Sequence, residues 1–99
     1  MHVVVNHLHL RDPLTEETTR ALSDAVQLVV DGGGLSAQVA KVDERHLILL
    51  LTFANAEQAD RVAREVGGPF MRDHVVPLLA RDTDRSLGEV IASASLRAE

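Results

Sequence analysis

The chain has 99 residues, 45% of them hydrophobic and 25% charged, and it contains no cysteine, which excludes disulfides, thiolate metal sites and a cysteine nucleophile. A net charge of −5 and only two aromatic residues argue against nucleic-acid binding, and the longest apolar run, residues 47–51, is far too short for a membrane span. The N-terminus lacks the basic region and cleavage site of a signal peptide, so we expect a single cytoplasmic domain over residues 1–99 with no nucleic-acid or membrane partner.

A strand and a helix are predicted for the first third of the chain. Residues 2–10 form a β-branched, apolar run with hydrophobic side chains on both faces, which is typical of a central strand. Asp12 is a good N-cap, and Pro13 suits the first position of the following helix because its missing N–H has no partner there anyway. Apolar side chains then recur at three-to-four spacing until the glycines at 32–34, where a left-handed glycine is expected to end the helix.

A hairpin and a second helix are predicted next. Residues 35–42 alternate between apolar and polar, residues 46–53 are apolar on both faces, and a polar turn of three residues joins them. Asn55 caps the second helix with Gln58 as its capping-box partner. This helix is expected to stop at residues 66–69, which contain two glycines and a proline.

The last third of the chain predicts a short helix and a strand. The helix spans residues 70–80 and is broken or restarted at Pro77, a charged loop covers 81–85, and the last strand runs over residues 86–96. The resulting strand-helix-strand-strand-helix-strand order predicts an α+β, ferredoxin-like split βαβ sandwich with strand order 4-1-3-2. That order places the two strands that are apolar on both faces at the centre of the sheet.

The second face of this sheet needs a cover. Helices cover only one face of a four-stranded sheet, yet Ile48 and Leu49 point to opposite faces, as do Val4 and Val5. No further layer is available in 99 residues, so a homodimer that packs sheet on sheet is the simplest cover. We therefore expect the chain to form a homodimer.

Two segments resemble a known family. Residues 51–59 (LTFANAEQA) combine an apolar strand, an aromatic residue, a cap and an acidic helix start, and residues 69–79 (PFMRDHVVPLL) contain a short helix that ends in Pro-Leu-Leu. Together with the layout of nearly the whole chain, they resemble the dimeric α/β-barrel superfamily, and within it the antibiotic biosynthesis monooxygenase-like domains. The resemblance implies one domain whose antiparallel sheet builds a dimeric α/β barrel with a second copy.

The resemblance also implies a small-molecule enzyme and candidate residues. Haem-degrading members place an asparagine in the first strand and a histidine beyond the second helix, and Asn6 and His74 stand at these places. Their tryptophan is missing, with an apolar residue near Val62 in its place, and the tyrosine and tryptophan of polyketide-oxidising members are absent as well. We therefore expect no cofactor: haem could bind through His74 but would not be degraded efficiently.

Asn6 and His74 are also the catalytic candidates that their own chemistry favours. Asn6 is a polar side chain in an apolar row, and a buried amide needs either a ligand or a structural hydrogen bond. His74 can act as an acid–base group or a ligand near neutral pH, unless it lies on the solvent side of its helix beside Arg72 and Asp73. We expect both side chains to face one cavity between the sheet and the helices.

An apolar pocket between the sheet and the helices is expected to hold the ligand, lined by Leu8, Phe53, Phe70 and Met71. The predicted function is that of a small-molecule enzyme similar to the cofactor-independent monooxygenases, an oxidoreductase or an isomerase, with a small apolar substrate. The alternative is a non-catalytic ligand-binding or regulatory ferredoxin-like dimer, which the absence of tryptophan and tyrosine favours.

Three histidines form a second candidate group. His7 and His9 point to one face of the first strand, and His46 begins the strand expected beside it. Three imidazoles at that end of the sheet suit Zn²⁺ or another divalent metal, although no carboxylate is tied to them by spacing. A polar rim on the dimer face is the alternative interpretation, and no metal site is assigned.

Overall fold

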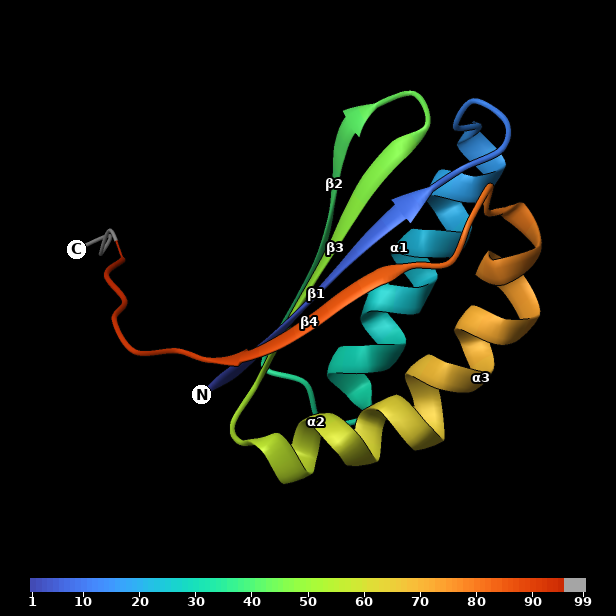
Figure 1. The fold of residues 1–99 in the computed structure, drawn as a ribbon. Helices are drawn as coiled ribbons and strands as arrows, with labels where there is room; N and C mark the ends of the chain where they lie inside the picture. The colour runs from blue at the N-terminus through green and yellow to red at the C-terminus, as the bar shows by residue number, and fades with distance from the viewer. Residues whose placement is uncertain (96–99) are drawn as a thin grey trace.

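Residues 1–95 are described by the computed structural model, in which the helices lie on one face of a four-stranded antiparallel sheet (Figure 1). The strands are β1 (His2–His9), β2 (Ser36–Asp43), β3 (His46–Phe53) and β4 (Asp84–Glu89). They are arranged in the order β2-β3-β1-β4, which is the predicted order 4-1-3-2 counted from the other edge. The ferredoxin-like α+β fold predicted from the sequence is therefore confirmed.

The register of the central pair, β1 and β3, decides which side chains face the helices. Asn6 lies opposite Leu49 on β3 and opposite Arg85 on β4. Side chains at the even positions of β1 and the odd positions of β3 turn toward the helices and are mostly buried, whereas their neighbours are half-buried on the other face. Within residues 1–95 that other face has no cover (Figure 1).

Helix α1 (Glu16–Asp31) begins later than predicted. Thr15 caps it, its hydroxyl oxygen accepting the backbone N–H three residues on at 3.1 Å, so the prediction of Asp12 as the N-cap is wrong. The segment before Thr15 stays outside the helix because the Leu14 N–H donates to the Glu44 carbonyl at 2.7 Å. This bond ties the start of the helical layer to the turn between β2 and β3.

The junction between α1 and α2 (Ala56–Val62) depends on a glycine. Gly33 has a φ of 124°, in the left-handed region predicted for the end of α1, and a Cβ there would lie 2.1 Å from Gln58 Nε2. Asn55 caps α2 as predicted, because its side chain accepts the Gln58 N–H at 2.8 Å. The Gln58 side chain donates to the Gly33 carbonyl at 3.3 Å, so the expected capping box is not completed.

The helical chain does not stop at residues 66–69, contrary to the prediction. After α2 it continues through a π-helical stretch (Ala63–Gly67), the short α3 (Gly68–Phe70), a second π-helical stretch (Met71–Val75) and a 3₁₀ turn (Val76–Leu78). In an α-helix, proline lacks the N–H donor and clashes with the carbonyl four residues earlier. In a π-helix the hydrogen bonds join residues five apart, so the carbonyl four residues before the proline is not needed as its partner. The Gly68 N–H donates to the Ala63 carbonyl, so close that a Cβ at residue 68 would lie 2.8 Å from the oxygen.

None of the helices in residues 1–95 has the length and apolar character that crossing a membrane requires.

β4 starts earlier and ends earlier than the strand predicted over residues 86–96. It pairs only with β1, from Asp84 opposite His7 to Glu89 opposite His2. Because β1 begins at His2, the residues that follow Glu89 find no partner strand. The predicted extension to residue 95 is therefore wrong, and residue 96 lies outside the described residues.

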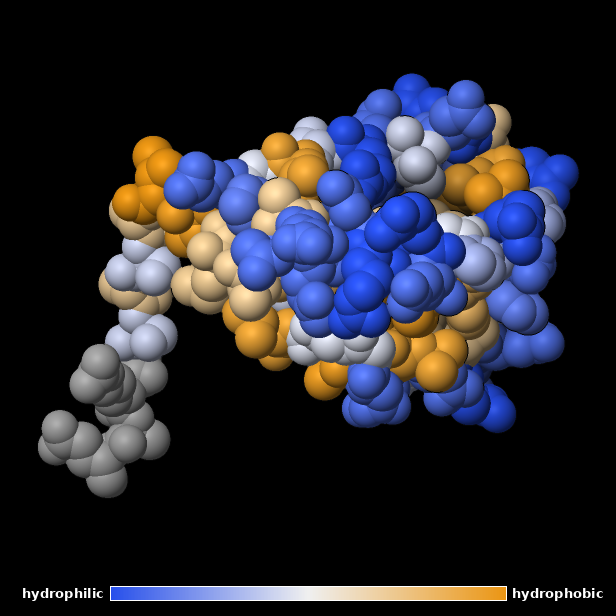
Figure 2. Space-filling model, turned by 90° about the horizontal axis from the view of Figure 1, so that it is seen from below, coloured by the Kyte–Doolittle hydropathy of each residue, from blue (hydrophilic) through white to orange (hydrophobic). Residues whose placement is uncertain are grey.

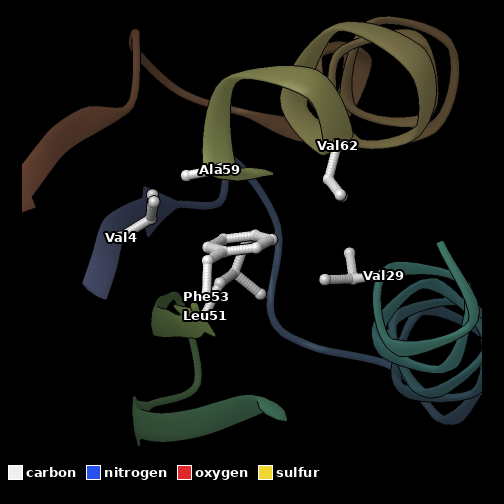
Figure 3. Close-up of a cluster of buried hydrophobic side chains, with 6 residues drawn as sticks. All are labelled: Val4, Val29, Leu51, Phe53, Ala59 and Val62. Atoms are coloured by element: carbon white, nitrogen blue, oxygen red, sulfur yellow. The ribbon is translucent and has the colours of Figure 1, made fainter. Parts of the chain in front are cut away.

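Two clusters of buried side chains form the core between the sheet and the helices. One surrounds Phe53, which is 1% exposed and lies among side chains from β1, α1 and α2 (Figure 3). Its buried members are Val4, Val29, Leu51, Phe53, Ala59 and Val62. The members of the second cluster are Leu8, Leu10, Leu22, Leu47 and Val75. Both clusters use the face of the sheet that α1 and α2 cover.

Truncation of Leu8 tests the second cluster. Leu8 is fully buried, so Leu8→Ala should lower the free energy of unfolding by about 2–5 kcal/mol, the usual loss for a buried leucine. Urea unfolding followed by circular dichroism measures this change. Leu35→Ala is the control, because Leu35 is 55% exposed and should change stability by no more than about 0.5 kcal/mol. Equal losses in both variants would contradict the assigned core.

Candidate functional site

A cavity of about 260 Å³ lies between the sheet and the helical layer. β1 and β3 line one side of it, α1 and α2 line the other, and Phe70 and Met71 line the part formed by the helical chain after α2. Within residues 1–95 the wall is apolar except for Asn6, Thr83 and Arg85. Its volume lies just below the usual range for drug-sized ligands, so a small and largely apolar molecule fits it best.

Asn6 is the buried polar group of this cavity. It is 7% exposed, and its amide takes part in none of the side-chain hydrogen bonds found within residues 1–95. Among the side-chain atoms of residues 1–95, His2 Nδ1 is the one that is both inaccessible to solvent and without a hydrogen-bond partner. The Asn6 amide has no partner but is not inaccessible, so it remains open to the cavity. An amide in this position can donate to and accept from a ligand.

Arg85 and Thr83 are cavity residues that the sequence analysis missed. Arg85 lies on β4 directly opposite Asn6, and Thr83 immediately precedes that strand. Both were included in a charged loop because the last strand was predicted to begin at residue 86. The signal that could have found Arg85 is antiparallel pairing, since a strand that starts two residues earlier turns Arg85 to the same face as Asn6.

His74 lies outside this cavity. It is exposed on the second π-helical stretch, with its ring packed against Phe70 at a centroid distance of 4.9 Å. It borders a separate hollow of about 20 Å³, which Leu8 and Val75 also line. The expectation that Asn6 and His74 face one cavity is therefore wrong, although Phe70 lines both spaces.

The predicted lining residues divide between these two spaces. Phe53, Phe70 and Met71 lie on the wall of the larger cavity, whereas Leu8 belongs to the core beneath the smaller hollow. Of the side chains from residues 1–95 that line the larger cavity, that of Arg85 alone is ionisable. The cavity thus offers an amide and a cation to a ligand, but no carboxylate or imidazole base.

The residues of the cavity do not fit a haem held by His74. Haem iron is bound by histidine, cysteine, methionine or tyrosine side chains. Among residues 1–95 the cavity wall supplies only Met71 of these types, and His74 stands at the other hollow. The axial role suggested for His74 therefore has no support in the geometry.

The other three candidate histidines lie on the opposite face of the sheet. His7, His9 and His46 come together at the end of β1 and the start of β3, as the strand order predicted. Within residues 1–95 no group of three or more side chains of the metal-binding types is arranged to hold one ion.

The unpaired amide of Asn6 generates a stability prediction. A buried amide without a partner costs free energy, so Asn6→Leu should leave the free energy of unfolding unchanged or raise it by about 1 kcal/mol. Urea unfolding measures the change. Leu51→Asn is the matched control, because it adds a buried amide to the same cavity wall and should cost about 2 kcal/mol or more. A loss above about 2 kcal/mol in Asn6→Leu would show that the amide holds a structural hydrogen bond.

No family model matches the sequence, and no curated protein matches it. Solved structures do match the fold. A putative antibiotic biosynthesis monooxygenase from Nitrosomonas europaea has a TM-score of 0.79 at 14% identity, with 93% of this chain and 100% of that chain covered. A variant of SnoaB, a cofactor-independent oxygenase from Streptomyces nogalater, has a TM-score of 0.78 at 9% identity over 93% and 94% of the two chains.

A third similar structure holds a ligand. It is a variant of MhuD with two manganese protoporphyrin IX molecules per active site, with a TM-score of 0.70 at 16% identity over 96% and 99% of the two chains. At these identities the likeness concerns the fold, which extends over nearly the whole of each chain. The chain is therefore an α+β protein with the ferredoxin-like fold of the antibiotic biosynthesis monooxygenase-like domains.

Proposed function

We propose that the protein binds a small, largely apolar molecule in the cavity and converts it as a cofactor-independent, monooxygenase-like enzyme. The observation that carries this proposal is the Asn6 amide, which is unpaired on the wall of an apolar cavity and lies across the strand pair from Arg85. A buried polar group without a protein partner is available to a ligand oxygen. The fold shared with SnoaB, described as a cofactor-independent oxygenase, supports the same class of reaction.

The two polar groups suit a substrate with a carbonyl or phenolic oxygen. Asn6 can donate a hydrogen bond to that oxygen, and the Arg85 guanidinium stabilises the negative charge that develops there when the substrate loses a proton. Because no base lines the cavity within residues 1–95, the substrate itself must be acidic, such as a phenol or a β-dicarbonyl, and its proton passes to water. In the overall reaction with O₂, one oxygen atom becomes a new carbonyl and the other leaves as water, with the two hydrogens taken from the CH₂ of a β-dicarbonyl or from the ring C–H and the O–H of a phenol.

The second candidate function is that of a non-catalytic ligand-binding or regulatory protein. The observation that favours it is the exposed position of His74, which removes the one imidazole that was expected to serve as a base in the cavity. The same cavity and the same polar groups would then bind a metabolite without converting it. Binding and turnover must therefore be measured separately.

A ligand screen with paired turnover measurements tests the two functions. Thermal shift with small phenols, naphthols and β-dicarbonyls should identify a ligand, and an oxygen electrode should detect O₂ consumption with that compound. Asn6→Leu should lower the ligand affinity about tenfold, the effect of losing one hydrogen bond in a buried site. Arg85→Gln should lower the affinity for the ionised form in particular, because the favourable charge is lost.

His74→Ala is the control for both variants, since His74 lies outside the cavity and should leave affinity and O₂ consumption unchanged. Binding that responds to Asn6→Leu without O₂ consumption would support the non-catalytic function. If Asn6→Leu and Arg85→Gln both bound the ligand as strongly as the parent protein does, the cavity would be ruled out as the site.

We further propose that the protein is a homodimer that packs sheet on sheet. Val3, Val5, Ile48 and Leu50, here named the open-face strip, are half-buried side chains on the face of the sheet that the helices leave uncovered. Figure 2 shows a different side of the molecule, seen from below, where hydrophilic atoms dominate the centre and hydrophobic atoms form separate groups near the projecting end and along the edges. An isologous pair of such faces would cover both strips over about 1,200 Å² or more.

A charge in the open-face strip tests this dimer. The parent protein should sediment as a dimer at micromolar concentration, and Leu50→Asp should sediment as a folded monomer, because an unpaired carboxylate in an apolar interface is costly. Leu28→Asp is the control, since Leu28 is 47% exposed on α1, away from the sheet face, and should leave the dimer intact. A monomeric parent, or equal dissociation in both variants, would rule out this interface.

A further inference from the structure

Three histidines gather at one end of the open sheet face, away from the cavity. His9 on β1 lies directly opposite His46 on β3, and His7 lies two residues earlier on the same face of β1. The three rings are neighbours: the centroids of His9 and His46 are 4.7 Å apart in a stacked arrangement, and those of His7 and His46 are 5.2 Å apart. Neither the cavity nor the proposed reaction uses these side chains.

Two ring nitrogens of this group point at each other. His7 Nδ1 and His46 Nε2 are 2.9 Å apart, so one nitrogen donates its proton to the lone pair of the other. Two nitrogen ligands of a tetrahedral ion, each at about 2.0–2.1 Å from the metal, lie about 3.3 Å apart. Small rotations of the two side chains are enough to move the two nitrogens apart by the missing few tenths of an ångström. One metal ion can then take the place of the shared proton.

His9 stacks on His46 and is not one of the proposed ligands. Its Nε2 faces the Arg81 guanidinium at 2.9 Å and the Asp84 carboxylate at 3.6 Å. Asp84 also lies directly opposite His7 on β4, with a side chain that is 70% exposed. Its negative charge offsets that of Arg81, so the cation does not make this end of the sheet unfavourable for a metal ion.

We propose that His7 and His46 form a two-imidazole site for a divalent first-row transition metal such as Cu²⁺, Ni²⁺ or Zn²⁺. Within residues 1–95 no third protein ligand is in place, so water fills the remaining positions. On metal binding, the N–H between the two rings moves to the outer nitrogen of the ring that carried it, so a neutral pair binds the ion without losing a proton. Imidazole ligands select these ions over Mg²⁺ and Ca²⁺, which prefer oxygen.

Calorimetric titration of the full-length, tag-free protein with NiCl₂ tests the site. One equivalent of Ni²⁺ per chain should bind, MgCl₂ should give no signal, and Cu²⁺ should bind more tightly than Ni²⁺. His7→Asn and His46→Asn should each weaken Ni²⁺ binding about tenfold or more. His74→Asn is the matched control, because it removes an exposed imidazole elsewhere and should leave the affinity unchanged. Equal affinity in all three variants, or equal loss in all three, would overturn the proposal.

A spectroscopic measurement on the unmodified chain covers the case in which a variant fails to fold, as judged by circular dichroism. Electron paramagnetic resonance of the protein with one equivalent of Cu²⁺ should show hyperfine coupling to two imidazole nitrogens. A spectrum with one nitrogen ligand, or that of the aqueous ion, would overturn the proposal. This experiment is independent of the proposed enzymatic function, because no substrate or O₂ is involved.

Discussion

The register of β1 against β3 is the constraint on which both faces of the molecule depend. It turns Asn6 and its apolar neighbours toward the helices and His7 toward the uncovered face. Because side chains alternate along a strand, a slip of one residue would exchange the two sets and put an imidazole into the core. The burial of Leu8 and Phe53 stabilises the observed register, since a shifted β1 would expose Leu8 to water and a shifted β3 would expose Phe53.

The sheet could be predicted from the sequence because its signals are local. Runs that are apolar on both faces marked the central strands, and the Asn55 cap and the left-handed glycine at 33 depend on a few neighbouring residues. The helical layer could not be predicted as well. Gly68 and the proline after it usually end a helix, but here the π-helical winding keeps the chain helical, because helical bonds of wider spacing bypass the missing donor.

The same irregularity explains why only part of the site could be predicted. Asn6 stood out as a polar residue in an apolar row, a pattern that depends only on strand alternation. The position of His74 depends on the winding of residues 63–75, where the spacing of an ordinary α-helix no longer gives the direction of a side chain. Arg85 was missed for a third reason: the start of β4 is fixed by pairing with β1, a long-range contact that local composition does not report.

β4 connects the two faces that the central pair separates. Its first two residues alternate, so that Asp84 lies beside the histidines on the open face while Arg85 lines the cavity. β4 is an edge strand whose ladder of hydrogen bonds runs to β1 alone, so it is held less firmly than the central strands. The cavity proposed to bind a ligand and the histidine pair proposed to bind an ion therefore lie on either side of the same short segment. Both proposed sites thus depend on the pairing of β4 with β1, which is the segment that the cavity and the histidine pair have in common.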